Sequence, residues 1–213
     1  MLNSFMLGPM SDLPPSEQSG LPLIISGPSG VGKSTIVNTL VERLGAVLSV
    51  SMTTRPMGPK DIEGEHYEFV NEREFRDMVK LGQMLEYAQV YDNLYGTPAE
   101  PVEEALAAGE IVILEVDVQG ANTIKQRMPD AVGILIEPPS DEVLLQRLRD
   151  RKREDEATIQ KRYSRARDEI KLAHELGIYK YSVVNDRLDE AIEQAIELIE
   201  GEIEARQGNH GRV

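Results

Sequence analysis

The sequence predicts an α/β protein in which helices cover both faces of a parallel sheet. Strand-like and helix-like segments alternate along the chain, as they do where crossover helices join parallel strands. The run EIVILEVD at 110–117 is apolar until its closing acids, which is typical of a strand buried on both faces. A glycine-rich turn at 27–32 separates the apolar run LPLIIS from a helical pattern. These three observations define the fold class.

The elements before residue 110 follow from apolar periodicity and from the glycine and proline residues that interrupt it. They are a strand at 21–26, a helix from about 32 to 44, a strand at 46–52, a loop at 53–66, a strand-like segment at 66–70, a helix at 71–82, strands within 84–97 and a short helix at 98–109. Asn71 is a typical helix N-cap, and Gly82 and Gly109 are typical stops. The partial alternation in 84–97 predicts a small antiparallel unit.

The second half of the chain alternates helix and strand. Its expected elements are a strand at 110–117, a helix around 119–127, a strand at 131–137, a helix at 140–150, a long helix at about 156–176, a strand at 181–185 and an acidic helix at 187–206. The segment SDLPPSEQSG at 11–20 is polar, contains two proline residues and lacks periodicity, so we expect a flexible tail at 1–20. We also expect a flexible C-terminus at 207–213.

Composition narrows the classes of function. The chain has 213 residues and a formal net charge of −14, which disfavours binding to nucleic acid or to anionic membranes. It contains no cysteine, so a reducing cytoplasm is expected and thiolate metal sites are excluded. The three histidines are far apart in sequence, which disfavours a histidine-rich metal site. A local cationic pocket for a small anion remains compatible with these features.

The segment GPSGVGKS at 27–34 matches the phosphate-binding loop (P-loop) pattern G-x-x-x-x-G-K-[ST], between a strand and a helix as that motif requires. Its backbone N–H groups would converge on phosphate oxygens at the positive end of the helix. Lys33 would reach the β- and γ-phosphates of ATP, and the Ser34 hydroxyl would bind Mg²⁺. The predicted ATP-binding residues of this segment are Gly27, Pro28, Ser29, Gly30, Val31, Gly32, Lys33, Ser34 and Thr35.

A P-loop leaves the reaction open. Asp117 and Gly120 are spaced as in a GTPase switch, but the late segment VVND lacks the lysine of a guanine-reading Asn-Lys-x-Asp motif, so a GTPase is disfavoured. Glu115 and Asp117 lie two residues apart at the end of a predicted parallel strand and therefore on one face. A solvated strand end is the alternative, but with a P-loop present we expect these acids to face the nucleotide, the metal or the substrate.

The chain resembles the guanylate kinase family from about residue 21 to 200. The resemblance rests on several motifs in family order: GPSGVGKST, SMTTR followed by D, G and YEF, EYAQVYDNLYGT, ILEVDVQG, RLRDRKREDEATIQKR and VVND. It implies a P-loop NTPase fold in three layers, with a core at 21–52 and 98–206, a β-rich GMP-binding insert at about 53–97 and a helical lid at about 150–160. It also implies transfer of phosphate from ATP to GMP in purine nucleotide recycling, with Mg²⁺, and leaves monomer and homodimer open.

The resemblance assigns the acceptor site residue by residue. Arg55 matches a guanidinium that grips the GMP phosphate with a planar fork, and Glu86 matches a carboxylate that accepts the two adjacent N–H groups of guanine. The GMP-binding residues implied are Ser51, Arg55, Tyr67, Glu86, Tyr95, Gly96, Thr97 and Asp117. On the residues alone, the tyrosines are equally compatible with strand packing and Glu86 with a plain surface position.

The resemblance also assigns the donor side. Arg151 and Arg162 match two catalytic arginines of the lid, which with Lys33 and Arg55 complete the implied catalytic set. Asn185 and Asp186 match a turn that borders the adenine of ATP. On the residues alone, the basic run around Arg151 is also compatible with a solvated helix face.

Gly58 is the local departure from the family pattern, because that position is usually basic and contacts the GMP phosphate. Lys60, two residues later, is the candidate substitute. Two alternatives stay open: a kinase for another small phosphate acceptor, which only Gly58 supports, and a non-catalytic phosphopeptide-binding scaffold. The intact pair of Lys33 and Ser34 disfavours the scaffold, since such domains typically have degraded P-loops.

Overall fold

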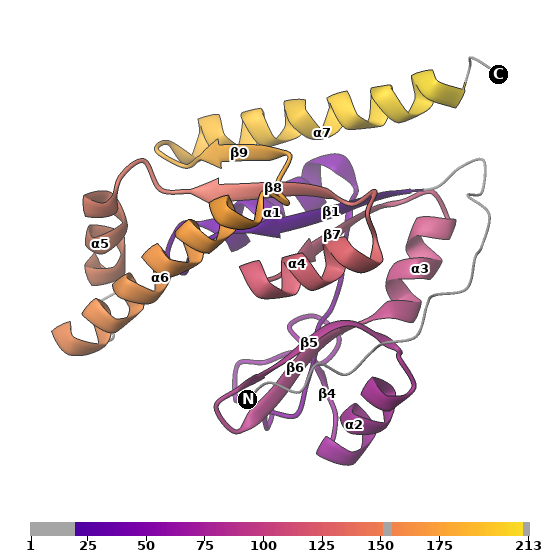
Figure 1. Ribbon diagram of the computed structural model, residues 1–213, viewed down its shortest axis with the longest axis horizontal. Helices are drawn as coiled ribbons and strands as arrows, with labels where there is room; N and C mark the ends of the chain where they lie inside the picture. Colours follow the sequence, from indigo (N-terminus) through magenta and orange to yellow (C-terminus); the bar gives the residue numbers. More distant parts are fainter. Residues whose placement is uncertain (1–19, 151–154, 211–213) are drawn as a thin grey trace.

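The computed structural model describes residues 20–150 and 155–210 (Figure 1). Its strands are β1 (Leu21–Ser26), β2 (Val47–Leu48), β3 (Met52–Thr53), β4 (Glu68–Phe69), β5 (Met84–Val90), β6 (Asn93–Pro98), β7 (Ile111–Glu115), β8 (Val132–Glu137) and β9 (Tyr181–Val184). Its helices are α1 (Lys33–Leu44), α2 (Glu72–Lys80), α3 (Ala99–Ala107), α4 (Val118–Arg127), α5 (Asp141–Asp150), α6 (Glu156–Leu176) and α7 (Leu188–His210).

The larger sheet has five parallel strands in the order β2-β7-β1-β8-β9, which confirms the predicted fold class. The central strand β1 pairs with β7 on one side and β8 on the other, and all six of its residues are buried. Because the strands are parallel, their carboxyl ends meet at one edge of the sheet. The P-loop after β1 and the acids after β7 therefore lie at the same edge.

Helices cover both faces of this sheet, and alternate residues of β1 point to opposite faces. Leu23 and Ile25 belong to a core shared with α1 and α7, whereas Ile24 belongs to a second core shared with α3 and α4. Figure 1 shows α7 running along one side of the sheet, with α3 and α4 on the other. This alternation favours apolar residues on both faces of β1, as in its first five residues, LPLII.

A smaller sheet of four strands, in the order β4-β3-β6-β5, carries α2 and lies apart from the larger sheet (Figure 1). The β5–β6 hairpin is antiparallel as predicted, but β3 and β4 pair in parallel. The predicted single strand at 46–52 is wrong. Its first part forms β2 in the larger sheet, and its end forms β3 in the smaller one. The predicted strand-like segment at 66–70 is reduced to the two residues of β4.

Local capping explains several helix boundaries. The side chains of Asn71, Asp117 and Asp155 accept N–H groups from the first turns of α2, α4 and α6. Gly45 and Gly177 end α1 and α6 in the left-handed conformation that glycine adopts readily.

Two predicted boundaries at the ends of the fold are wrong. Gly20, assigned to the tail, is buried, and its N–H donates to the Leu106 carbonyl at 2.8 Å. The last helix continues to His210, beyond the predicted end at 206, while residues 1–19 and 211–213 lie outside the described part. Among the described helices, none combines the length and the apolar character that a membrane span requires.

Candidate active site

The P-loop connects β1 to α1 and lines a cavity of about 530 Å³. Gly30 and Gly32 have φ values of 92° and 96°, which residues other than glycine rarely adopt. Gly32 also approaches Asn185 so closely that a Cβ would lie 2.5 Å from its Nδ2. Of the predicted ATP-binding residues, the cavity is lined by Gly27, Pro28, Ser29, Gly30, Gly32, Lys33, Ser34 and Thr35.

Lys33 and Ser34 open α1 and face the acid at the end of β7. The Lys33 Nζ donates to the Gly27 carbonyl at 3.1 Å and lies 4.0 Å from Glu115 Oε1. The Ser34 hydroxyl donates to the same Glu115 oxygen at 3.0 Å. The parallel pairing of β1 with β7 places these groups together, because both strands end at the same edge of the sheet.

A second cavity, of about 670 Å³, adjoins the first. Of the predicted GMP-binding residues it is lined by Ser51, Tyr67 and Asp117, and Asn38, Glu65 and His66 also line it. Lys33, Ser34, Glu115 and Asp117 line both cavities. A ligand in one cavity therefore lies next to a ligand in the other, across a wall that carries the P-loop lysine.

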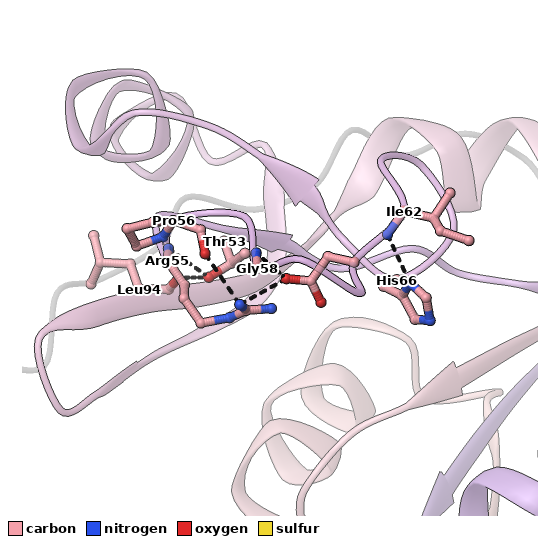
Figure 2. Close-up of polar contacts among 8 residues, drawn as sticks. Thr53, Arg55, Pro56, Gly58, Ile62, His66 and Leu94 are labelled. Atoms are coloured by element: carbon pink, nitrogen blue, oxygen red, sulfur yellow. Dashed lines mark hydrogen bonds and ion pairs between the residues drawn. The ribbon is translucent and has the colours of Figure 1, made fainter.

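Arg55 lies at the start of the loop after β3 and is held from several directions (Figure 2). Its backbone N–H donates to the buried Thr53 hydroxyl at 3.1 Å, and its guanidinium pairs with Asp61 at 2.8 Å. The guanidinium carbon lies 5.5 Å from the ring centre of Tyr67 and 5.4 Å from that of Phe69, within the range of cation–π attraction. The hydrogen bond with Asp61 raises the pKa of Arg55 and lowers the pKa of Asp61.

Gly58 takes part in the same loop through its backbone. Its N–H donates to Asp61 Oδ2 at 2.6 Å (Figure 2), and its carbonyl accepts the Asp61 N–H at 3.1 Å. A Cβ at this position would lie 3.0 Å from the same carboxylate oxygen. The departure from the family pattern therefore coincides with a tight turn that holds the partner of Arg55.

Glu86 on β5 pairs with Thr97 on β6, and the Thr97 hydroxyl donates to its Oε1 at 2.8 Å. Burial raises the pKa of Glu86 to about 7, the hydrogen bond from Thr97 opposes that shift, and the charge of Asp117 adds to it. Gly120, in the first turn of α4, is so close that a Cβ would lie 3.2 Å from Glu86 Oε2. Glu86 is thus a half-buried carboxyl between the smaller sheet and the start of α4.

The remaining residues of the predicted acceptor site lie on β6. The Tyr95 ring lies 5.7 Å from the Tyr67 ring in an edge-on arrangement. Gly96 pairs with Met52 and Tyr87, where a Cβ would lie 2.8 Å from the Glu86 carbonyl oxygen. The structure brings these residues together with Arg55 and Glu86 on one sheet, beside the second cavity rather than in its described lining.

The two predicted arginines of the lid differ in what the structure describes. Arg162, on α6, lines the P-loop cavity and donates to the Ser29 hydroxyl. Arg151 lies outside the described residues, as do 152–154, so the predicted lid is described only at its flanks, the ends of α5 and α6.

Asn185 follows β9, is 4% exposed and donates from Nδ2 to the Val31 carbonyl at 2.7 Å. Asp186 is exposed, and its carbonyl accepts from Arg147 at 3.2 Å. Neither residue is in the described lining of the P-loop cavity. Asn185 thus stabilises the P-loop through its hydrogen bond to Val31. The sequence did not predict this contact.

Sequence reasoning also left several lining residues out of the predicted site. Glu115 was noted only as a strand-end acid, although its contact with Ser34 follows from the pairing of β1 and β7. Tyr91, Arg165 and Glu169 line the P-loop cavity from the β5–β6 turn and from α6. Tyr91 lies within the motif EYAQVYDNLYGT, but that motif assigned it no role, and Arg165 and Glu169 belong to none of the quoted motifs. Only the packing of these elements reveals the three residues as part of the cavity wall.

Comparisons with known proteins agree with this geometry. The family model described as guanylate kinase matches residues 19–202. The chain is 45% identical over 182 residues to the guanylate kinase of Gloeobacter violaceus, covering 85% of this chain and 87% of the relative. It is 44% identical over 178 residues to that of Synechocystis sp., with 83% and 92% covered.

Among solved structures, the guanylate kinase from Anaplasma phagocytophilum superimposes with a TM-score of 0.69 at 32% identity, covering 87% of each chain. The sequence family, the curated relatives and the fold thus agree. This chain belongs to the guanylate kinase family.

Proposed function

We propose that this chain transfers the γ-phosphate of ATP to GMP, giving ADP and GDP, in purine nucleotide recycling. The observation that carries the proposal is the wall of Lys33, Ser34, Glu115 and Asp117 shared by two adjacent cavities. One cavity is lined by the P-loop, which suits a nucleoside triphosphate. The other lies beside the smaller sheet and the residues Arg55, Tyr67, Tyr95 and Glu86. Two nucleotides bound there would meet at their phosphates.

On the donor side, the residues proposed to bind ATP are those of the P-loop from Gly27 to Thr35, with Asn185 and Asp186 at the turn after β9. Lys33 would neutralise charge on the β- and γ-phosphates. Arg162, which lines the same cavity, would stabilise the transferring group, and Arg151 is proposed as its partner from the lid.

On the acceptor side, Arg55, Tyr67 and Tyr95 are proposed to hold the phosphate of GMP. The rings already form an edge-on pair beside the guanidinium, which supports a common ligand. Glu86 is proposed to accept the N–H groups of guanine, with Asp117 as a second acceptor and Ser51 and Thr97 as hydroxyl partners. The half-buried position of Glu86 makes its carboxylate selective for a ligand that donates hydrogen bonds.

The residues at the shared wall fit a magnesium ion that arrives with ATP. The Ser34 hydroxyl and Glu115 carboxylate are hard oxygen donors 3.0 Å apart, and magnesium in kinase sites is held by few protein groups together with substrate phosphates. We propose Ser34 as the protein ligand. When bound, Mg²⁺ would neutralise charge on the phosphates.

The proposed reaction needs no protein nucleophile, because the acceptor is an anion. A phosphate oxygen of GMP forms a bond to the γ-phosphorus, and the bond from that phosphorus to the bridging β-phosphate oxygen breaks. The residues of this chain hold the two phosphates in line and balance their charge. We further propose a cytoplasmic location, in line with the absence of cysteine.

A coupled assay of ADP formation tests the proposal. Purified protein is incubated with ATP, Mg²⁺ and GMP, AMP, CMP, UMP or dTMP in turn. Turnover with GMP far above the others is expected, since only guanine offers the two adjacent donors that Glu86 accepts. Preference for another acceptor would support the alternative kinase, and turnover with none would favour the non-catalytic scaffold.

A further inference from the structure

Tyr91 has a backbone conformation that its side chain disfavours. Its φ is 55°, and within residues 20–150 and 155–210 it is the one residue other than glycine with positive φ. It occupies, with Asp92, the two-residue turn between β5 and β6. Such turns require positive φ and are usually made with glycine, asparagine or aspartate. A bulky aromatic residue at this position costs stability, which points to a function.

Local contacts do not explain a tyrosine at this position. The Gln89 side chain donates to the Tyr91 backbone carbonyl at 3.1 Å, which any residue type at position 91 would accept equally. Tyr91 is 83% exposed, so burial in the protein does not compensate for the backbone conformation. A binding partner is therefore the remaining source of a favourable contact for the ring.

The position of Tyr91 indicates which partner. Tyr91 lies in a turn between two strands of the smaller sheet, yet it lines the P-loop cavity and is not in the described lining of the second cavity. Arg162, Arg165 and Glu169 of α6 line the same cavity. The turn thus reaches across to the cavity proposed for ATP.

We propose that Tyr91 is a donor-nucleotide-binding residue: its ring packs against bound ATP and closes the P-loop cavity on the side of the smaller sheet. The inference rests on the proposed function in one respect, that the P-loop cavity binds ATP. It adds a contact that couples the acceptor-binding sheet to the donor. The strained backbone of the turn is retained because it directs this ring toward the cavity.

The test compares binding of a non-hydrolysable ATP analogue with Mg²⁺, measured by calorimetry without GMP. Tyr91→Asn removes the ring and introduces a residue that accepts positive φ. Its dissociation constant is expected to rise about five- to twentyfold, as for the loss of a partly buried aromatic contact. Tyr91→Phe retains the ring and should bind within about twofold of the wild type.

Thermal unfolding separates binding from folding. Because asparagine relieves the backbone strain, the melting temperature of Tyr91→Asn should match the wild type or exceed it by about 2–4 °C. Tyr87→Thr is the matched control: it removes an exposed tyrosine of β5 that is not in the described lining of the P-loop cavity, and it should leave analogue binding unchanged. A melting temperature several degrees lower for Tyr91→Asn would overturn the inference, since the ring would then serve the fold.

Equal analogue binding by Tyr91→Asn and wild type would also overturn it, while leaving the proposed function intact. Lys33→Ala distinguishes the two failures. If the wild type binds the analogue no better than Lys33→Ala, the P-loop cavity is not the ATP site, and both the proposed function and this inference fail.

Discussion

The Asp61 carboxylate pairs with the Arg55 guanidinium at 2.8 Å, and the same oxygen accepts the Gly58 N–H at 2.6 Å. This arrangement gives Gly58 a structural role in place of the cation that the family usually has at this position. Gly58 does not supply the usual cation, but its backbone supplies a hydrogen bond and its missing Cβ leaves room for the carboxylate. We therefore interpret Asp61 as a residue that positions Arg55 for the proposed acceptor phosphate.

Asp61→Asn should raise the KM for GMP about three- to tenfold, because the neutral amide holds the guanidinium less firmly. The KM for ATP should stay unchanged, since Asp61 is not in the described lining of the P-loop cavity. Steady-state kinetics with each substrate varied in turn provide the measurement. Asp77→Asn, which breaks an exposed ion pair on α2, is the control. Equal effects on both KM values would argue for a general loss of fold instead.

Lys60→Ala tests whether this lysine replaces the cation missing at Gly58. Lys60 is exposed in the turn between Gly58 and Asp61. Loss of one charge-assisted contact is worth about 1.5–3 kcal/mol, or roughly ten- to a hundredfold in kcat/KM for GMP. Unchanged KM and kcat would show that Lys60 is not the substitute and that Arg55 acts with the tyrosines alone.

The pKa of Glu86 predicts a pH dependence of GMP use. With a pKa of about 7, against 4.5 for an ordinary glutamate, the free enzyme holds this carboxyl protonated at mildly acidic pH. Only the ionised form accepts both donors of guanine, so kcat/KM for GMP should rise as the pH increases through about 7 and then level off. Glu86→Gln should reduce kcat/KM and flatten this rise. A wild-type profile that is already flat from pH 5.5 to 8.5 would contradict the assignment.

The same carboxyl affects folding stability with a defined sign. Between pH 4.5 and about 7 the unfolded chain has released a proton that folded Glu86 retains. Stability should therefore fall as the pH rises through this window, and this contribution should be absent in Glu86→Gln. Urea unfolding of both proteins at pH 5, 6 and 7.5 measures it. The difference between the two free energies of unfolding should change in favour of the variant toward pH 7.5, and a constant difference would refute the shift.

Asn185→Ala should lower stability and weaken ATP use together. The variant leaves the Val31 carbonyl without its side-chain donor in a buried position, which costs about 1–3 kcal/mol. Since Val31 lies in the P-loop, the KM for ATP should rise while that for GMP changes little. Asn185→Asp has the same shape but no N–H and should behave similarly. A raised KM for ATP at unchanged melting temperature would show that Asn185 acts through the proposed contact with ATP and not through its support of Val31.

The sequence predicted those features that local chemistry determines. The P-loop context follows from glycine spacing and a preceding apolar strand, and the helices follow from apolar periodicity and, for α2, from the Asn71 cap. The split of 46–52 was not predictable from periodicity. Its residues are uniformly compatible with a strand, and only the pairing of β2 with β7 and of β3 with β6 separates them.

In the candidate site, too, local motifs predict some residues, and others depend on tertiary structure. Lys33 and Ser34 are recognisable from a contiguous motif, whereas Glu115 joins them only through the register of two strands far apart in sequence. The conformation of Tyr91 and the support that Asn185 gives to Val31 depend on tertiary packing. Periodicity and motifs carry no information about such contacts.

Transfer of label from ATP to GMP is the most direct test of the proposed function. The purified chain is incubated with Mg²⁺, GMP and ATP labelled at the γ-phosphate, and the products are separated by chromatography. The account predicts that label appears in the β-phosphate of GDP in equal amount to the ADP formed, and that Lys33→Ala reduces this by about a hundredfold or more. Label released only as inorganic phosphate, or no GDP at all, would contradict it.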